Sequence, residues 1–213
     1  MKSRSHFPPP VRPYRQTARA ETAEATAREI LEAFSECMRK QWFDEVTLDE
    51  VARRAGVNVR TVVRRYGGKE GLLKGFVENF VPSVAVNRET QPGDVEAAVE
   101  RLIEIYEAWG DSVIRNLAQE PRHRSLKPLL DLGRSHHRGI TARAFAPWLE
   151  PLGQRDRRDT LDALVAATDV YVWKLARRDM GRSRAETGLL LRRLVDAVLA
   201  QATTLVSNPR SPS

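Results

Sequence analysis

Basic side chains gather in the segment from residue 59 to residue 69, which contains no acidic residue. Its cations are Arg60, Arg64, Arg65 and Lys69. Guanidinium groups can bind phosphate oxygens and the edge of guanine, and cations without neighbouring acids attract a polyanion because they release its counterions. The formal net charge of +7 and the pI near 10.0 agree with an anionic partner. The segment therefore predicts contacts with nucleic acid.

A second basic segment without acids lies at the N-terminus. Residues 1–20 hold five cations: Lys2, Arg4, Arg12, Arg15 and Arg19. The same residues include four prolines and show no helical apolar period, which predicts a flexible basic arm. Two acid-free segments that flank one small helical unit are typical of a DNA-binding footprint. Residues 207–213 are predicted to be a disordered tail.

The residues around the central arginines predict two short helices joined by a tight turn. Thr47 and Glu50 have the spacing of a capping box that opens the first helix. Gly56 suits a turn that requires positive φ, and Asn58 can cap the second helix, which extends to Tyr66. Helices joined in this way cross steeply, so the second can enter a major groove while the first crosses the backbone. The pattern predicts a helix-turn-helix, and an ordinary helical corner is the alternative.

The rest of the chain predicts an all-α protein. Apolar residues recur at helical spacing, and no strand-like alternation of useful length appears. We expect an N-terminal three-helix helix-turn-helix DNA-binding domain at residues 21–80, braced by a first helix over about 22–40, and a larger C-terminal helical domain at residues 81–206. Cys37 falls on the apolar stripe of the first helix, which predicts a buried thiol, with a redox sensor as the alternative.

A family resemblance is carried by residues 47–73, TLDEVARRAGVNVRTVVRRYGGKEGLL. A Thr-capped helix, an Ala-Gly-Val turn, a short basic helix and a Lys-Glu pair follow one another as in the DNA-binding domain of the TetR family of transcriptional regulators, which this stretch resembles. The resemblance implies a homodimer that binds palindromic double-stranded operator DNA. It also implies a repressor that a small-molecule effector releases from the operator.

The same resemblance implies roles for particular side chains. Thr47, Thr61 and Lys69 would contact phosphates, and Val59, Arg60 and Arg64 would contact bases or the groove. Val63 stands where the family usually has a phosphate-binding tyrosine, which Arg64 or Arg65 would replace. Tyr66 would be an aromatic wedge against the first helix and against the fourth helix, which the Lys-Glu pair opens. The candidate DNA-binding residues are Thr47, Asn58, Val59, Arg60, Thr61, Arg64, Arg65 and Lys69.

The C-terminal domain ends in two apolar-striped helices. Helices are expected at about residues 94–110, 111–120, 122–149, 156–178 and 183–205. The last has an apolar arc wider than one neighbour can cover, which indicates an interface. The TetR resemblance implies that these two helices pair with their symmetry mates, and packing within the same chain is the alternative. The candidate dimer residues are Leu161, Val165, Thr168, Val172, Leu191, Leu194, Val195, Val198 and Ala202.

Large aromatic residues lie on helices that, by the resemblance, surround an effector cavity. The candidate effector-binding residues are Tyr106, Trp109, Phe145, Trp148, Asp169, Tyr171 and Trp173. We expect a mainly apolar or aromatic small molecule, while core packing is the alternative for each aromatic. Asp169 is an acid in an apolar stretch, where it could meet the effector, bond across the dimer or reach solvent.

Other chemistries find little support in the sequence. The adjacent His136 and His137 lack the i, i+4 spacing of zinc ligands, so solvated or capping histidines are expected, with no metal and no cofactor. No phosphate-binding loop, nucleophile elbow or catalytic carboxylate pair is recognisable, so an enzyme is not expected. No membrane-length apolar run or signal core occurs, which favours a cytoplasmic protein. The alternative function is a helical small-molecule-binding or interaction module whose basic patch binds acidic proteins or membrane surfaces.

Overall fold

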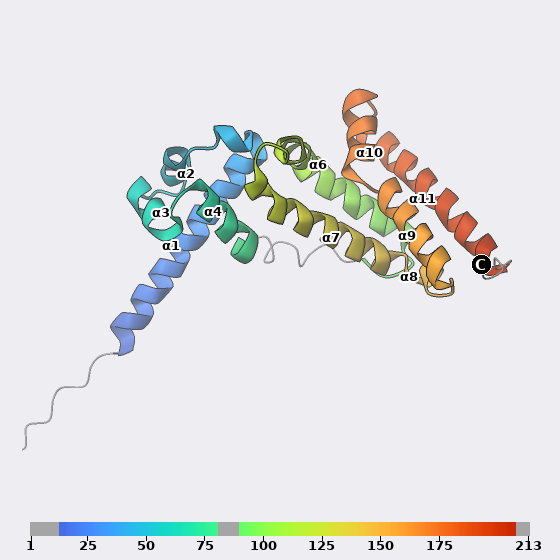
Figure 1. The fold of residues 1–213 in the computed structure, drawn as a ribbon, viewed down its shortest axis with the longest axis horizontal. Helices are drawn as coiled ribbons and strands as arrows, with labels where there is room; N and C mark the ends of the chain where they lie inside the picture. Colours follow the sequence, from blue (N-terminus) through green and yellow to red (C-terminus); the bar gives the residue numbers. More distant parts are fainter. Residues whose placement is uncertain (1–12, 81–89, 208–213) are drawn as a thin grey trace, which may run out of the picture.

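A computed structural model describes residues 13–80 and 90–207, and every element within these ranges is helical (Figure 1). The all-α prediction is confirmed. One end of the molecule is formed by α1 to α4, the middle by α6 and α7, and the other end by α9 to α11. The elements are α1 (Pro13–Lys40), η1 (Phe43–Glu45), α2 (Leu48–Arg54), α3 (Val59–Tyr66), α4 (Lys69–Gly75), η2 (Phe76–Phe80), α6 (Val95–Gln119), η3 (Arg124–Leu126), α7 (Lys127–Ala144), α8 (Ala146–Leu149), α9 (Gln154–Ala167), α10 (Val170–Lys174), η4 (Leu175–Asp179) and α11 (Arg184–Ser207).

Helix α1 begins earlier than the sequence predicts. It starts at Pro13 rather than near residue 22, so residues 13–20, which were expected in the arm, are helical. Proline suits the first turn of a helix because its φ is already helical and its missing N–H has no intrahelical partner there. Residues 1–12 of the expected arm and residues 208–213 of the expected tail lie outside the described residues.

The N-terminal unit has its own core, in which α1 packs against α2, α3 and α4. Ile30, Phe34, Val51, Val62 and Leu72 are all fully buried in it. Cys37 is also fully buried, and this burial raises the pKa of its thiol, which keeps the sulfur protonated and unreactive. The buried-thiol interpretation therefore holds over the redox sensor.

Two leucines from the second half of the chain complete this first core. Leu126 at the end of η3 is fully buried, and Leu130 in the first turns of α7 is nearly so; both belong to the N-terminal cluster rather than to the C-terminal one. The sequence assigns both residues to the second domain, but their side chains pack in the core of the N-terminal unit. The two units thus share an apolar boundary rather than only a linker.

The first helix of the C-terminal unit differs from the prediction. The expected helices at 94–110 and 111–120 are one continuous helix, α6, which runs through Gly110. Glycine costs a helix interior about 1 kcal/mol relative to alanine, so a break was expected there. Gly110 instead makes room for the fully buried indole of Trp173, which lies where a side chain at position 110 would be.

Two other expected helices are each interrupted. The segment 122–149 divides at Phe145, because Pro147 opens α8 and cannot continue the hydrogen bonds of α7. The segment 156–178 divides at Asp169, whose carboxylate accepts a hydrogen bond from the N–H of Tyr171 and caps α10. Asp169 is thus a helix cap, a role that the sequence analysis did not consider for it. The expected capping box at the start of α11 is present, since the backbone N–H groups of Ser183 and Glu186 each donate to the other residue's side chain.

None of the helices within residues 13–80 and 90–207 combines the length and apolar character needed to cross a bilayer.

Replacement of Gly110 by alanine tests how closely Trp173 packs on α6. The new Cβ would lie 2.4 Å from Cζ3 of Trp173, so the indole must shift. We expect the free energy of unfolding to fall by about 1 to 3 kcal/mol despite the higher helix propensity of alanine. Gly133→Ala is the control, because nothing lies within 4 Å of its Cβ, and it should stabilise the protein by about 0.5 to 1 kcal/mol. Urea unfolding of both variants measures the difference, and equal effects would contradict this packing.

Candidate nucleic-acid interface and ligand cavity

The turn between α2 and α3 is held by backbone hydrogen bonds. Gly56 has a φ of +65°, and its N–H donates to the carbonyl of Arg53, while the N–H of Val57 donates to the carbonyl of Ala52. This pair of bonds is the Schellman motif, which satisfies the last carbonyls of α2. Asn58 then caps α3 by accepting a hydrogen bond from the N–H of Arg60 at 2.9 Å. The turn predicted from Gly56 and Asn58 is confirmed.

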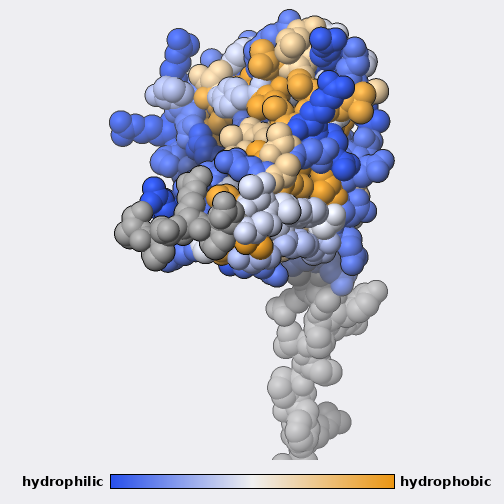
Figure 2. Space-filling view, turned by 90° about the vertical axis from the view of Figure 1, so that its right-hand side faces the viewer, coloured by the Kyte–Doolittle hydropathy of each residue, from blue (hydrophilic) through white to orange (hydrophobic). Residues whose placement is uncertain are grey.

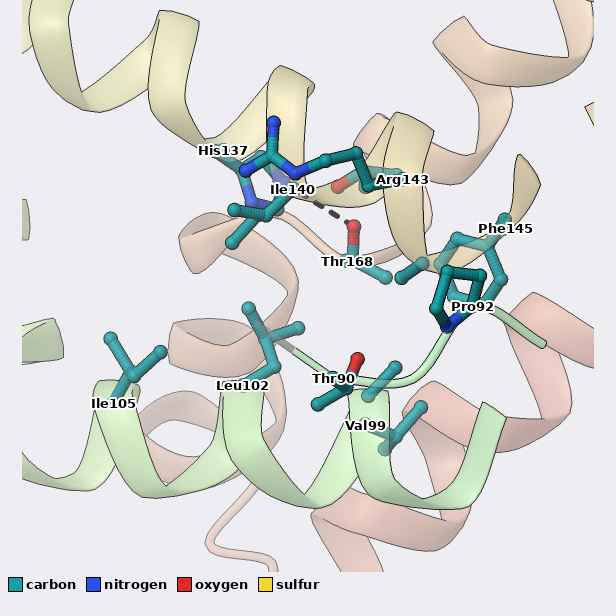
Figure 3. Close-up of a pocket in the computed structure, with 13 residues that line it drawn as sticks. Thr90, Pro92, Val99, Leu102, Ile105, His137, Ile140, Arg143, Phe145 and Thr168 are labelled. Atoms are coloured by element: carbon teal, nitrogen blue, oxygen red, sulfur yellow. Dashed lines mark hydrogen bonds between the residues drawn. The ribbon is translucent and has the colours of Figure 1, made fainter. Parts of the chain in front are cut away.

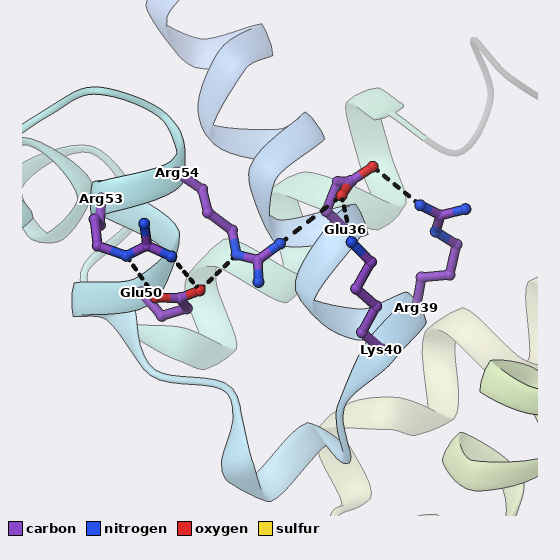
Figure 4. Close-up of polar contacts among 6 residues, drawn as sticks. All are labelled: Glu36, Arg39, Lys40, Glu50, Arg53 and Arg54. Atoms are coloured by element: carbon purple, nitrogen blue, oxygen red, sulfur yellow. Dashed lines mark hydrogen bonds and ion pairs between the residues drawn. The ribbon is translucent and has the colours of Figure 1, made fainter.

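Glu50 has a different partner from the one the sequence predicts. Thr47 does cap α2 by accepting from the N–H of Glu50 at 3.3 Å. The Glu50 carboxylate, however, accepts from Arg53 and Arg54 rather than from the N–H of Thr47 (Figure 4). These hydrogen bonds lower the pKa of Glu50 to about 2. Arg54 also lies 3.8 Å from Glu36 of α1, so the ion pairs join α2 to the brace helix.

The outer face of α3 is cationic. Val62 is fully buried against the core, whereas Arg60, Arg64 and Arg65 are exposed. Within residues 13–80 and 90–207, no carboxylate forms an ion pair with any of these three arginines. This contrasts with Arg53 and Arg54, whose charges Glu50 compensates. The face of α3 can therefore offer its guanidinium groups to an anion without first breaking an ion pair.

The other candidate DNA-binding residues border this face. Thr47 and Asn58 are exposed at the N-termini of α2 and α3, while Val59 and Thr61 are half-buried in the first turn of α3. Val63, which stands where the family usually has tyrosine, is 44% exposed beside the arginines.

Lys69 has a structural contact that the sequence did not predict. Its ammonium group donates to the carbonyl oxygens of Phe43 at 2.9 Å and Asp44 at 3.0 Å, and lies 4.9 Å from the centre of the Phe43 ring. Partial burial lowers the pKa of Lys69. The residue therefore ties the start of α4 to η1, which leaves one N–H for a phosphate.

Tyr66 is the wedge that the resemblance implies. Its hydroxyl lies 3.5 Å from the carbonyl oxygen of Ala27 in α1, and its ring covers Gly75 of α4, where an added Cβ would meet Cε1 at 2.6 Å. At Gly71 an added Cβ would lie 1.8 Å from the Tyr66 carbonyl oxygen. These two glycines let α3 and α4 approach closely.

The family model for bacterial regulatory proteins of the tetR family matches residues 30–75, which span most of α1 and the elements α2 to α4. Residues 30–75 are therefore similar to the N-terminal domain of TetR-family regulators. An uncharacterized HTH-type transcriptional regulator of Mycobacterium bovis is 30% identical over 93 residues, which are 43% of this chain and 49% of that protein. Two proteins of Mycobacterium tuberculosis with the same description match to the same extent. The chain thus matches about half the length of these relatives.

The fold of this chain also resembles a solved structure. A protein of Pseudomonas aeruginosa PAO1, described as a candidate transcriptional regulator, superimposes with a TM-score of 0.61 at 16% sequence identity. The likeness covers 84% of this chain and 92% of the other. At this identity the likeness concerns the fold, and it extends through the C-terminal unit.

A cavity of about 140 Å³ lies between α6 and α7 (Figure 3). Of the candidate effector residues, only Phe145 lines it. Tyr106 and Trp173 instead pack on each other within the core, with ring centres 5.9 Å apart, and Tyr171 lies on the outer surface. The remaining cavity residues are Thr90, Pro92, Ala98, Val99, Leu102, Ile105, His137, Ile140, Thr141, Arg143, Ala144 and Thr168.

The candidate aromatics outside the cavity have packing or surface roles. Trp173 donates its indole N–H to Glu107 at 3.0 Å, Trp109 lies beneath the guanidinium of Arg39, and Trp148 packs beside Phe145. His137, which the sequence predicted to be solvated or to cap a helix, instead lines the cavity. The usable signal was the i, i+4 spacing of His137 and Thr141, which places both on one face of a helix.

The candidate dimer residues divide between two environments. Leu191, Val195 and Ala202 are buried within their own chain, and Thr168 lines the cavity, so these four are not available to a partner. Leu161, Val165, Val172 and Val198 are half-buried, while Leu194 is exposed. The exposed hydrophobic residues of this end, here called the C-terminal patch, are Tyr171, Leu175, Met180, Leu189, Leu194 and Val206.

Figure 2 views this end of the molecule and shows hydrophobic residues gathered across it. Leu189 is the most exposed residue of the C-terminal patch, at 62%. The wide apolar arc predicted for the last helix therefore has one side in the core and the other on the surface.

Polar contacts join the N-terminal unit to α6. Arg115 donates to the carbonyl of Arg39, and the Gln119 amide donates to Asp44 and accepts from its backbone N–H. Phe43 packs edge-on against His123, with ring centres 5.5 Å apart. Across the described residues, no three His, Cys, Asp or Glu side chains come close enough together to hold a metal.

Replacement of Lys69 by methionine tests its contact with η1. Methionine keeps the length of the side chain but leaves the carbonyls of Phe43 and Asp44 without this donor, so we expect the free energy of unfolding to fall by about 1 to 2 kcal/mol. Lys74→Met is the matched control on the same helix. Lys74 is exposed, and its ion pair with Glu78 is long, at 3.9 Å. Its replacement should therefore change the free energy of unfolding by less than about 0.5 kcal/mol. If urea unfolding gave Lys69→Met the stability of the parent, Lys69 would be available for phosphate binding alone.

Proposed function

We propose that the protein is a homodimeric DNA-binding transcriptional repressor that a small-molecule effector releases from its operator. The observation that carries the DNA-binding part is the outer face of α3, where Arg60, Arg64 and Arg65 have no acidic partner among the described residues. The Schellman turn and the Asn58 cap give this helix a defined orientation relative to α2. The match of residues 30–75 to the model for tetR-family regulatory proteins supports the same conclusion.

We propose that long and short side chains make different contacts with DNA. Arg60 and Arg64 lie one turn apart on α3 and can reach base edges in the major groove, where arginine pairs with guanine through two hydrogen bonds. Thr47 and Thr61 have short side chains near helix N-termini, which suits phosphate oxygens. Arg65 is proposed to replace the phosphate contact that Val63 cannot make.

The C-terminal patch is proposed to form the dimer interface. Its large apolar side chains lie on α10, η4 and α11, and an exposed apolar surface of this kind normally marks an association site. A two-fold axis through this end would pair α11 with its own copy. The two α3 helices must then lie about 34 to 36 Å apart, or a multiple, to reach successive major grooves.

Effector control is proposed to pass through α6 and α7. The cavity lies between these helices, and the same helices contact the N-terminal unit through Arg115, Gln119 and Leu130. A ligand weakens DNA binding only if it prefers a conformation with wrongly placed α3 helices. A preference of about 10-fold to 100-fold corresponds to about 1.4 to 2.7 kcal/mol of coupling, and bound operator must weaken the ligand equally.

Alanine variants of Arg60 and Arg64 test the DNA-binding face. We expect each to weaken binding to a double-stranded fragment selected from a random-sequence pool by about 1 to 3 kcal/mol, and to relax base preference at one or two positions. Arg158→Ala removes the same charge from an exposed site on α9 and should leave affinity unchanged. Fluorescence anisotropy at several salt concentrations gives the affinities and salt slopes. If the α3 variants bound like Arg158→Ala, or if the parent preferred anionic vesicles to DNA, the assignment would be wrong.

Glutamates at Leu189 and Leu194 test the dimer interface. Both side chains are exposed on α11, so charge there should prevent association without disturbing the core. We expect sedimentation to give monomers for the double variant and dimers for Leu132→Glu, a control at an exposed leucine of α7. Monomers should also bind DNA more weakly, because only one half-site is contacted at a time. A dimer that survives both glutamates would exclude the C-terminal patch as the interface.

A further inference from the structure

The cavity between α6 and α7 has two unlike walls (Figure 3). Helix α6 contributes Val99, Leu102 and Ile105, which form an apolar wall. Helix α7 contributes His137 and Thr141, which lie one turn apart on the same face. In a mainly apolar cavity, a few polar atoms decide which ligand binds and in which orientation. The states of these two side chains therefore define the ligand chemistry.

The hydrogen bonds of His137 determine which ring nitrogen carries its proton. Nε2 lies 3.3 Å from the backbone carbonyl oxygen of Val165 and 3.3 Å from the hydroxyl oxygen of Thr168. A carbonyl oxygen can only accept, so Nε2 must carry the hydrogen. The Thr168 hydroxyl donates in turn to the carbonyl of Leu164 at 2.7 Å, which leaves its oxygen as a second acceptor for Nε2.

The other ring nitrogen of His137 is then an acceptor. Burial lowers the pKa of His137, which keeps the ring neutral near pH 7 and leaves a lone pair on Nδ1. No described residue hydrogen-bonds Nδ1. A molecule in the cavity that has a hydrogen-bond donor would supply the missing partner.

Thr141 adds a hydroxyl group next to this acceptor. The residue is only 4% exposed, and within the described residues its hydroxyl has no hydrogen-bond partner. A buried polar group without a partner costs free energy, so a ligand that satisfies it gains affinity. One ligand hydroxyl can donate to Nδ1 of His137 and accept from Oγ1 of Thr141.

The size of the cavity limits the rest of the ligand. Its volume is about 140 Å³. An apolar cavity of about 150 Å³ accepts a single benzene ring. The apolar wall of α6 and the ring of Phe145 provide the surface against which such a ring can pack.

We propose that this cavity binds a neutral phenol with a single aromatic ring, whose hydroxyl bridges His137 and Thr141. The regulatory meaning of this assignment rests on the proposed function, whereas the binding itself does not. A carboxylate has no proton to give to Nδ1 of a neutral histidine. Arg143 at the edge of the cavity is the residue that an anionic ligand would use instead.

NMR titration of the full chain with phenol, toluene and benzoate tests the proposal without DNA. Toluene matches phenol in shape but has no hydroxyl, and benzoate carries the competing anionic group. We expect phenol to bind about tenfold more tightly than toluene, as one or two neutral hydrogen bonds would give, and more tightly than benzoate. Equal affinity for phenol and toluene, or a preference for benzoate, would overturn the assignment.

Variants of α7 test which side chain causes the preference for phenol over toluene. His137→Leu should bind phenol and toluene equally, and its retained binding of toluene would demonstrate an intact cavity. Thr141→Val, which keeps the shape of the side chain, should lower phenol affinity by about threefold without affecting toluene. His136→Leu is the control at the neighbouring histidine, which does not line the cavity, and should keep the tenfold preference. A preference that persists in His137→Leu would exclude the proposed contact.

The same probes with a selected DNA fragment separate this proposal from the proposed function. Phenol that binds the protein but leaves its DNA affinity unchanged would support the ligand assignment and contradict effector release. DNA release by another compound, without phenol binding, would contradict only the ligand assignment.

Discussion

The insertion of Leu126 and Leu130 into the core of the N-terminal unit is the contact on which the relation between the two units depends. A fully buried leucine contributes about 1.5 to 3 kcal/mol, more than the polar contacts along α6 are expected to add. These two side chains therefore hold the N-terminal unit at a set position relative to the C-terminal unit, with η3 packed against α4. Because they lie at the junction of η3 and α7, any displacement of α7 must be transmitted to the core of the N-terminal unit.

This arrangement changes which helix can transmit an effector signal. A sequence argument favours α4, which follows the helix-turn-helix directly. In the structure, however, Gly71 and Gly75 bring α4 against Tyr66, so α4 belongs firmly to the N-terminal unit. The cavity instead shares α6 and α7 with the contacts made by Arg115 and Leu130. The effector path that we propose therefore runs through the apolar boundary.

Within the described part of the N-terminal unit, the arginines of α2 have acidic partners and those of α3 do not. Arg53 and Arg54 are compensated by Glu50, and Glu36 joins this group to α1 through Arg54 (Figure 4). These exposed pairs contribute little stability individually, but they reduce the net charge of α2. The uncompensated charge is left on α3. Uncompensated positive charge, which attracts a polyanion, therefore lies on the helix that we propose enters the groove.

Local sequence features predicted the helix-turn-helix well, because its boundaries depend on short-range contacts. Thr47, Gly56 and Asn58 each act within a few residues of their position, so spacing alone identifies them. The continuity of α6 and the cap at Asp169 were not predicted, because Gly110 accommodates a tryptophan 63 positions later and Asp169 caps a helix whose start was not recognised. His137 was missed for the same reason, since α9, which buries it, is distant in sequence. The dimer residues were misassigned where one apolar helix serves both the core and the surface.

The placement of Trp109 beneath Arg39 gives the molecule an intrinsic optical probe of its own junction. Indole emission responds to nearby charge and to water, so any movement of α1 against α6 should alter the fluorescence of this residue. The other tryptophans occupy different environments: Trp42 is exposed at the start of η1, Trp148 packs beside a cavity residue, and Trp173 is fully buried. Single-tryptophan variants would therefore separate optical changes at η1, the contact of α1 with α6, the cavity and the core without any added label.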